Sequence, residues 1–246
     1  MPSASKSTLQ RLLKDIEAFS IKVRILPGLA DIAQGKVSVS ELKEVDITDL
    51  LGRKEVEPQR KLLDKNIRNK TVLITGAGPI GMMSALIAKH VGARNVVVTD
   101  INEYRLDLCR ELGISHTYHA KNDLRELMPS LKMSEGFDVA LEMSGSPDAL
   151  NNIISSVKNG AKIALLGILP DDTKISWNDV IFKDLFIKGI YGREIFESWY
   201  KMISMLDSGL SVDGLVTHEF HYENFEEAIA VIKSGQSGKV ILNWDK

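Results

Sequence analysis

Residues 71–90, TVLITGAGPIGMMSALIAKH, decide the fold of this chain, because they combine a buried strand, a glycine-rich turn and a helix. Thr71–Thr75 is a short β-branched apolar run, typical of a strand that is covered on both faces. The six residues that follow fit the pattern G-x-G-x-x-G: Gly76, Ala77, Gly78, Pro79, Ile80 and Gly81. This order of elements is the one in which a turn can receive a phosphate group.

Each glycine of the turn has a separate mechanical reason. Gly76 allows the tight turn out of the strand, Gly78 lets the backbone approach a pyrophosphate, and Gly81 lets the helix pack closely on the strand. Pro79 suits the first turn of the helix, where its missing N–H costs no hydrogen bond. Asp100 ends the next apolar run, near the spacing of the acid that holds an adenosine ribose. These features predict a dinucleotide site; glycines that serve packing alone are the alternative.

The chain beyond this turn alternates apolar runs with helical patterns, which predicts βαβ units. Six runs qualify as strands: 71–75, 95–99, 116–119, 138–142, 162–166 and 185–190. Glycines at 92, 113 and 160 are expected to end helices. The pattern predicts an α/β fold with a doubly wound, six-stranded parallel Rossmann sheet.

We expect three regions along the chain. Residues 71–214 form the Rossmann domain, with a last helix near 194–207. Residues 215–246 form a C-terminal strand-helix-strand: 216–220, 225–233 and 239–243. Residues 1–70, with a helix expected at 8–19 and a strand at 22–26, have too few apolar groups for a core of their own and are an N-terminal attachment.

Composition excludes several classes of function. The 246 residues include 31 Lys and Arg against 33 Asp and Glu, and this net charge of −2 predicts no nucleic-acid partner. No apolar run is long enough to span a membrane and no signal peptide is recognised, so we expect a cytoplasmic protein without a membrane partner. The single cysteine, Cys109, excludes an intrachain disulfide and is read as a small buried hydrophobe rather than a reactive thiol.

The acid at the second strand also indicates which dinucleotide is bound. The Asp100 carboxylate can accept hydrogen bonds from both ribose hydroxyls and would repel a 2′-phosphate, which favours NAD(H) over NADP(H). Ile101 is a further candidate contact. Arg105 could stack on adenine or meet a phosphate, although an exposed helix residue is the simpler interpretation.

Residues 76–246 resemble the C-terminal half of the L-threonine 3-dehydrogenase family, in the zinc-dependent medium-chain dehydrogenase superfamily. Five segments carry this resemblance: GAGPIG, AKHVGARNVVVTDINEYRLDL, EGFDVALEMSG, FIKGIYGRE and SGQSGKVIL. The resemblance implies NAD as cofactor and a homo-oligomer, a dimer or larger, that pairs through strand 185–190. It also implies cofactor contacts from two loops: Ser144 and Gly145, and Gly167, Ile168 and Leu169.

The resemblance does not include a catalytic zinc site. In that family a separate N-terminal domain supplies the Cys, His and Glu ligands, and no matching residues are recognised in this sequence. We therefore assign neither a metal site nor a catalytic residue, and expect negligible oxidation of threonine. The five histidines, at 90, 116, 119, 218 and 221, are read as surface or packing residues.

Residues 1–75 resemble a different family, the segment before the catalytic domain of polysaccharide-biosynthesis nucleotide-sugar epimerase/dehydratases. That family uses a downstream Tyr-x-x-x-Lys pair, but none of the five tyrosines here has Lys four residues later. Sugar dehydration by that chemistry is therefore not expected. Because both families share the strand and its glycine loop, we interpret the chain as a chimera, natural or engineered.

Three functions remain open at this point. The first is an NAD(H)-binding Rossmann domain without efficient turnover. The second is residual NAD-dependent oxidation of L-threonine or a related amino alcohol. The third is a non-catalytic assembly or scaffold module whose glycine turn no longer binds a cofactor. Titration with NAD(H) separates the first from the third.

Overall fold

The structure, a computed structural model, describes residues 24–25, 43–44, 66–192 and 196–245. The chain divides into two compact units, Met1–Glu57 and Pro58–Lys246. In the first unit, β1 (Arg24–Ile25) pairs antiparallel with β2 (Lys43–Glu44). β1 lies within the strand expected at 22–26, whereas the helix expected at 8–19 falls outside the described residues.

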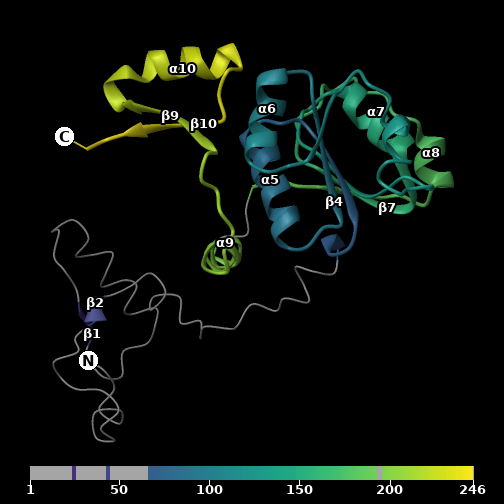
Figure 1. Cartoon of the computed structure of the whole chain (residues 1–246), viewed down its shortest axis with the longest axis horizontal. Helices are drawn as coiled ribbons and strands as arrows, with labels where there is room; N and C mark the ends of the chain where they lie inside the picture. Colours follow the sequence, from purple (N-terminus) through teal and green to yellow (C-terminus); the bar gives the residue numbers. More distant parts are fainter. Residues whose placement is uncertain (1–23, 26–42, 45–65, 193–195, 246) are drawn as a thin grey trace, which may run out of the picture. The chain divides into compact units, whose positions relative to one another are not determined.

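A six-stranded parallel sheet forms the centre of the second unit (Figure 1). Its order is β5-β4-β3-β6-β7-β8. The strands are β3 (Thr71–Thr75), β4 (Asn95–Asp100), β5 (His116–His119), β6 (Phe137–Glu142), β7 (Val157–Leu165) and β8 (Phe186–Gly189). This order confirms the predicted doubly wound Rossmann sheet.

Helices cover both faces of this sheet (Figure 1). They are α5 (Pro79–His90), α6 (Glu103–Glu111), α7 (Pro147–Ser156) and α8 (Trp177–Phe182), with a 3-10 turn, η2, at Leu124–Leu127. The central strand β3 contributes side chains to the apolar core on both faces of the sheet, because its successive side chains point to opposite faces. Val72 and Ile74 join the apolar cluster of α5 and α6, and Leu73 joins the cluster of α7. The uninterrupted apolar run in the sequence is explained by this double covering.

The glycine signals are confirmed in two cases and wrong in one. Gly92 and Gly113 have positive φ and follow the ends of α5 and α6. Gly160 does not end a helix, because α7 already ends at Ser156. Its positive φ instead lies inside β7, which begins at residue 157, well before the predicted 162. The pairing of β6 with β7 shifts register near this irregular start.

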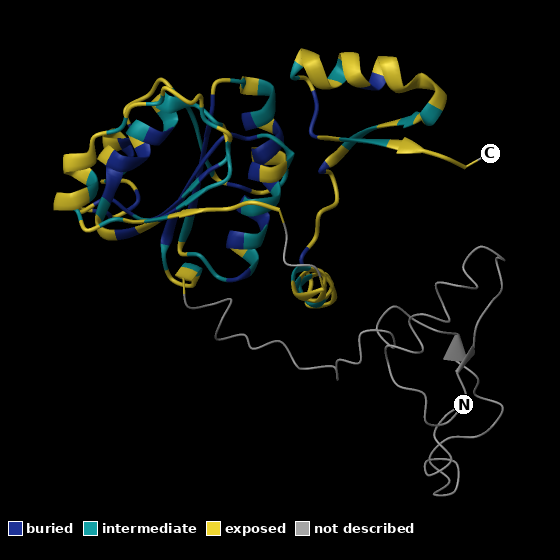
Figure 2. Ribbon diagram, turned by 180° about the vertical axis from the view of Figure 1, so that it is seen from behind, coloured by how far each residue is buried: buried dark blue, intermediate teal, exposed yellow. Residues whose placement is uncertain are grey.

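The C-terminal elements form a second, smaller sheet. After α9 (Glu197–Asp207), β9 (Val216–His221) pairs in parallel with β10 (Lys239–Asn243). The 3-10 turn η3 (Tyr222–Asn224) and helix α10 (Phe225–Ser234) connect them. Much of α9 and α10 is exposed (Figure 2). None of the helices in the described part of the chain is long and apolar enough to cross a membrane.

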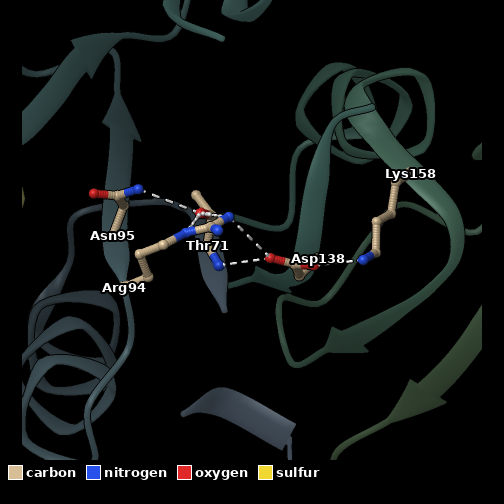
Figure 3. A network of polar contacts seen from close by, with 5 residues as sticks. All are labelled: Thr71, Arg94, Asn95, Asp138 and Lys158. Atoms are coloured by element: carbon tan, nitrogen blue, oxygen red, sulfur yellow. Dashed lines mark hydrogen bonds and ion pairs between the residues drawn. The ribbon is translucent and has the colours of Figure 1, made fainter. Parts of the chain in front are cut away.

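A polar network joins four strands, β3, β4, β6 and β7, at the amino edge of the main sheet (Figure 3). The Thr71 N–H donates to Asp138 Oδ2 at 2.8 Å, and Lys158 Nζ lies 2.6 Å from Asp138 Oδ1. Arg94 and Asn95 donate to the Thr71 hydroxyl. The network therefore fixes the first residue of β3 to β4 and β6, at the end of the sheet opposite the glycine turn.

Asp138→Ala is expected to lower the free energy of unfolding by about 1–3 kcal/mol, since it leaves the buried Thr71 N–H without its acceptor. Denaturant unfolding measures this change. Asp172→Ala, at an exposed loop position, is the control and should change stability by less than about 0.5 kcal/mol. Equal stability of the two variants would show that the network contributes nothing.

The same carboxylate gives stability a defined pH dependence. Burial opposes ionisation of Asp138, but hydrogen bonds from Lys158 and the Thr71 N–H, with the charges of Lys158 and Lys70, outweigh it and lower its pKa. Its contribution is therefore complete above the ordinary value of about 3.9 and is lost as pH falls through the lower, folded-state pKa. In acid unfolding curves, the stability difference between wild type and Asp138→Ala should shrink below that ordinary value.

Candidate dinucleotide-binding site

The candidate site lies at the carboxyl edge of the sheet, between β3 and β6. From β3 the chain continues through β4 and β5 on one side, and then crosses to β6, β7 and β8 on the other. A reversal of this kind leaves a crevice outside the carboxyl ends of the strands, where open α/β sheets bind their ligands. The glycine turn follows β3 at this edge of the sheet.

The three glycines of the turn meet different surroundings. Gly76 has φ +93°, and a Cβ there would lie 2.9 Å from the Ser144 backbone nitrogen. A Cβ on Gly81 would lie 1.8 Å from the Gly76 carbonyl oxygen, so the start of α5 packs directly on the turn. Gly78 is extended, with φ −70° and ψ 177°, and a Cβ there would meet nothing within 4 Å. Gly78 is thus the glycine that faces open space.

The first turn of α5 leaves donors free beside that space. Among residues 66–192, the N–H groups of Gly78, Ile80 and Gly81 make no hydrogen bond. No side chain caps this helix, and its first turn has no acidic residue. Pro79 begins the helix as predicted. Free N–H groups and the positive end of a helix dipole favour a bound anion such as a diphosphate.

Asp100 connects the glycine turn to the end of β4. Its carboxylate is buried: Oδ2 accepts from the Ala77 N–H at 2.6 Å, and Oδ1 accepts from the Asn102 N–H at 2.8 Å. Each oxygen keeps capacity for another donor, such as a ribose hydroxyl. Ile101 is 74% exposed and offers an apolar surface beside it. In the described part of the chain, Arg105 Nε is buried without a hydrogen-bond partner.

Asn102 was not among the predicted site residues. It caps α6 by accepting from the Arg105 N–H at 3.3 Å, and its Nδ2 donates to the Gly235 carbonyl at 3.0 Å. The predicted adenosine side of the site is therefore attached to the end of α10. An asparagine just before a helical run is a capping signal, but nothing in the sequence indicates its distant partner.

The two loops implied by the resemblance lie together in the structure. Gly145 follows β6 with φ +71°, and a Cβ there would lie 2.7 Å from the Ile168 carbonyl oxygen. A Cβ on Gly167 would lie 2.2 Å from the Gly145 nitrogen. Ile168 is 94% exposed, whereas Leu169 packs against the apolar cluster of α7. The backbone of Gly76 also lies close to that of Ser144. The predicted glycine turn and the two predicted loops therefore lie together at one edge of the sheet.

A second buried acid was also missed by sequence reasoning. Glu142 ends β6 and is fully buried, where it accepts hydrogen bonds from Thr75, Ser144 and Gly145. The available signal was an acid at the end of an otherwise apolar run, the same position that Asp100 takes on β4. Its partners could not be identified before the loops were placed.

The remaining candidates lie outside this site. Cys109 is fully buried, and burial, followed by the charge of Asp100, raises its pKa to about 11, as expected for an unreactive thiol. His90 contacts the Ser208 hydroxyl at 2.9 Å. Within residues 66–192 and 196–245, no three His, Cys, Asp or Glu side chains gather in a way that could hold a metal ion.

Known proteins resemble this chain over the same region. The L-threonine 3-dehydrogenase of Burkholderia vietnamiensis (strain G4 / LMG 22486) is 56% identical over 183 residues, which cover 74% of this chain and 54% of the relative. That of Chromobacterium violaceum is 55% identical over 183 residues, with the same coverage of each chain. The chain thus spans about half the length of these curated relatives.

A solved structure and a family model agree with this relationship. An alcohol dehydrogenase zinc-binding domain protein from Burkholderia ambifaria is 25% identical, with a TM-score of 0.66 over 76% of this chain and 52% of that one. The family described as zinc-binding dehydrogenase matches residues 79–208, just over half of the chain. These residues run from the first turn of α5 through α9 and include the predicted contacts at Asp100, Ser144 and Gly167. The chain therefore belongs to the zinc-binding dehydrogenase family.

Proposed function

We propose that this protein binds NAD(H) at the carboxyl edge of its Rossmann sheet. The observation that carries the proposal is Gly78, whose missing side chain leaves open space beside free N–H groups of α5. The diphosphate would lie against Gly78 and the start of this helix. The adenosine ribose would bind Asp100, with Ile101 and Arg105 beside it, and the nicotinamide half would lie against the loops at Ser144 and Gly167.

The environment of Asp100 supports NAD(H) rather than NADP(H). Its two carboxylate oxygens are held by the N–H groups of Ala77 and Asn102, so the charge stays fixed where the ribose 2′-hydroxyl would bind. A 2′-phosphate at this position would be repelled by the negative charge of the Asp100 carboxylate.

Calorimetric titration of the purified protein with NADH and NADPH tests this proposal. We expect NADH to bind at least about tenfold more tightly, because placing like charges together costs more than the 1.4 kcal/mol that this ratio represents. Asp100→Ser should reduce the difference. Equal affinity for the two cofactors would contradict the assigned ribose contact, and no heat with either would contradict cofactor binding altogether.

The family name implies zinc, but the described residues do not fit such a site. No described cluster of His, Cys, Asp or Glu could hold the ion. We therefore assign no metal ion to these residues, and propose a cofactor-binding role without efficient turnover. L-threonine 3-dehydrogenase is the name of the two relatives, each of which is about twice as long as the region that matches this chain.

We propose a separate origin for residues 1–75, as a chimera with an epimerase/dehydratase-like segment. Its support is the resemblance seen in the sequence, together with a 183-residue match to the dehydrogenases that covers only 74% of the chain. Most of this segment lies outside the described residues.

We also propose that the protein forms a dimer through the outer edge of β8. Among the strands that the structure describes, β8 pairs with β7 alone, and it is shorter than the predicted 185–190. Apolar side chains beside the open edge are exposed, including Phe186 at 58% and Tyr191 in full. Unpaired backbone groups flanked by apolar side chains favour pairing with a second copy.

Phe186→Glu is expected to convert such a dimer to monomer, because it places a charge in the paired surface. Light scattering after size-exclusion chromatography measures the mass. Phe225→Glu is the matched control, since Phe225 is similarly exposed, at 49%, but lies on α10. A wild-type protein that is monomeric, or a control that dissociates equally, would contradict the role of β8.

A further inference from the structure

The carboxylate of Glu142 is a buried charge that collects donors from two strand ends. At Oε1 it accepts from the Thr75 hydroxyl at 3.3 Å, the Ser144 N–H at 2.9 Å and the Gly145 N–H at 3.0 Å. The Ser144 hydroxyl donates to the same oxygen. A buried carboxylate is costly unless it is compensated in this way. Glu142 therefore imposes one arrangement on the loop that follows β6.

The backbone of Glu142 extends this arrangement to a third strand. Its carbonyl oxygen accepts from the Leu166 N–H at 3.0 Å and the Gly167 N–H at 3.1 Å. A Cβ on Gly167 would lie 2.3 Å from Glu142 Oε2, so the β7 loop packs directly on the carboxylate. Since Gly167 also packs on Gly145, the loops after β6 and β7 share Glu142 as their common contact.

We infer that Glu142 is a positioning residue, which holds these two loops in the shape that receives the nicotinamide half of the cofactor. The inference rests on the proposed NAD(H) binding. A Rossmann sheet binds a dinucleotide with two mononucleotide-binding halves. Asp100 lies in the half formed by β3, β4 and β5, whereas the loops that Glu142 holds belong to the half formed by β6, β7 and β8. Glu142 thus affects the two ends of the cofactor unequally.

The binding affinities for NADH and ADP test whether Glu142 acts on the nicotinamide end alone, because ADP carries only the adenosine and diphosphate groups. Glu142→Gln removes the charge and places an amide NH2 where Oε2 faces the Gly145 N–H at 3.2 Å. Hydrogen bonds to a charged group are strong enough that we expect NADH to bind about tenfold more weakly. Calorimetry should show ADP affinity changed by less than about twofold. The fluorescence enhancement of bound NADH should also fall.

The controls separate positioning from folding. Glu126→Gln, at an exposed position of η2, should change neither affinity. Thr75→Val removes the hydroxyl that donates to Glu142, with little change in side-chain shape. This variant should weaken NADH binding about threefold without weakening ADP binding. This variant decides the question if Glu142→Gln does not fold.

Two failures can be told apart. A wild-type protein that binds neither NADH nor ADP overturns the proposed function, and the inference with it. A wild type that binds both, with Glu142→Gln and Thr75→Val leaving the ratio of NADH to ADP affinity unchanged, overturns the positioning role alone. A selective loss of NADH affinity supports it, because a purely structural role would weaken both ligands alike.

Discussion

Gly78→Val is expected to weaken NADH binding by about 100-fold without loss of thermal stability. A Cβ at this position meets no protein atom within 4 Å, and the backbone there is extended, a conformation that valine adopts readily. The added atoms would instead occupy the space assigned to the diphosphate. The expected factor is the upper end of the ~1–3 kcal/mol cost of forcing atoms into occupied space. Calorimetry with NADH, beside a thermal unfolding curve, measures both effects.

Gly78→Ala provides the graded comparison. If the loss of affinity is steric, the smaller alanine side chain should weaken NADH binding less than valine does, again without loss of stability. If both variants bound NADH as tightly as wild type, the diphosphate would not lie against Gly78, and the proposed site would be wrong.

Gly81→Ala is expected to destabilise the protein by about 3 kcal/mol, although it adds a single methyl group. Its Cβ would lie 1.8 Å from the Gly76 carbonyl oxygen, so α5 or the glycine turn must move. For a chain of this size, the thermal midpoint should fall by roughly 6–12 °C. NADH binding should weaken as well, since the helix start carries the free donors.

The matched control for Gly81→Ala is Gly78→Ala, which adds the same group three residues earlier in the same turn. Only Gly81→Ala should lower the midpoint temperature of thermal unfolding. Equal midpoints for the two variants would mean that the close packing of α5 on the turn does not contribute to stability.

Much of the fold is predictable because its signals are local. The doubly covered strands show as apolar runs, and β3, β5 and β10 have the predicted limits. The turn at Gly76 and the close helix contact at Gly81 were also predictable, since the pattern G-x-G-x-x-G states where a turn and a helix each need a missing side chain. The ligand contact at Gly78 stays a prediction. The placement of Asp100 beside Ala77 follows from the same pattern.

The errors and omissions depend on contacts that are distant in the sequence. The sequence predicts a helix end at Gly160, because a glycine between a helix and a strand indicates a stop, whereas β7 pairs with β6 from Val157 and includes Gly160. Asn102 meets Gly235, which is 133 positions away, and Glu142 finds its donors only when three strands lie together. Local patterns mark such residues as caps or strand ends, but tertiary structure gives them their partners.

A crystal structure of the protein with NADH is the most direct test of the central claim, that the carboxyl edge of the sheet binds this cofactor. We expect diphosphate oxygens within hydrogen-bonding distance of the N–H groups at the start of α5. We also expect ribose hydroxyls on the Asp100 carboxylate and the nicotinamide beside Ser144 and Gly167. Cofactor bound elsewhere, or a site left empty at saturating NADH, would contradict it.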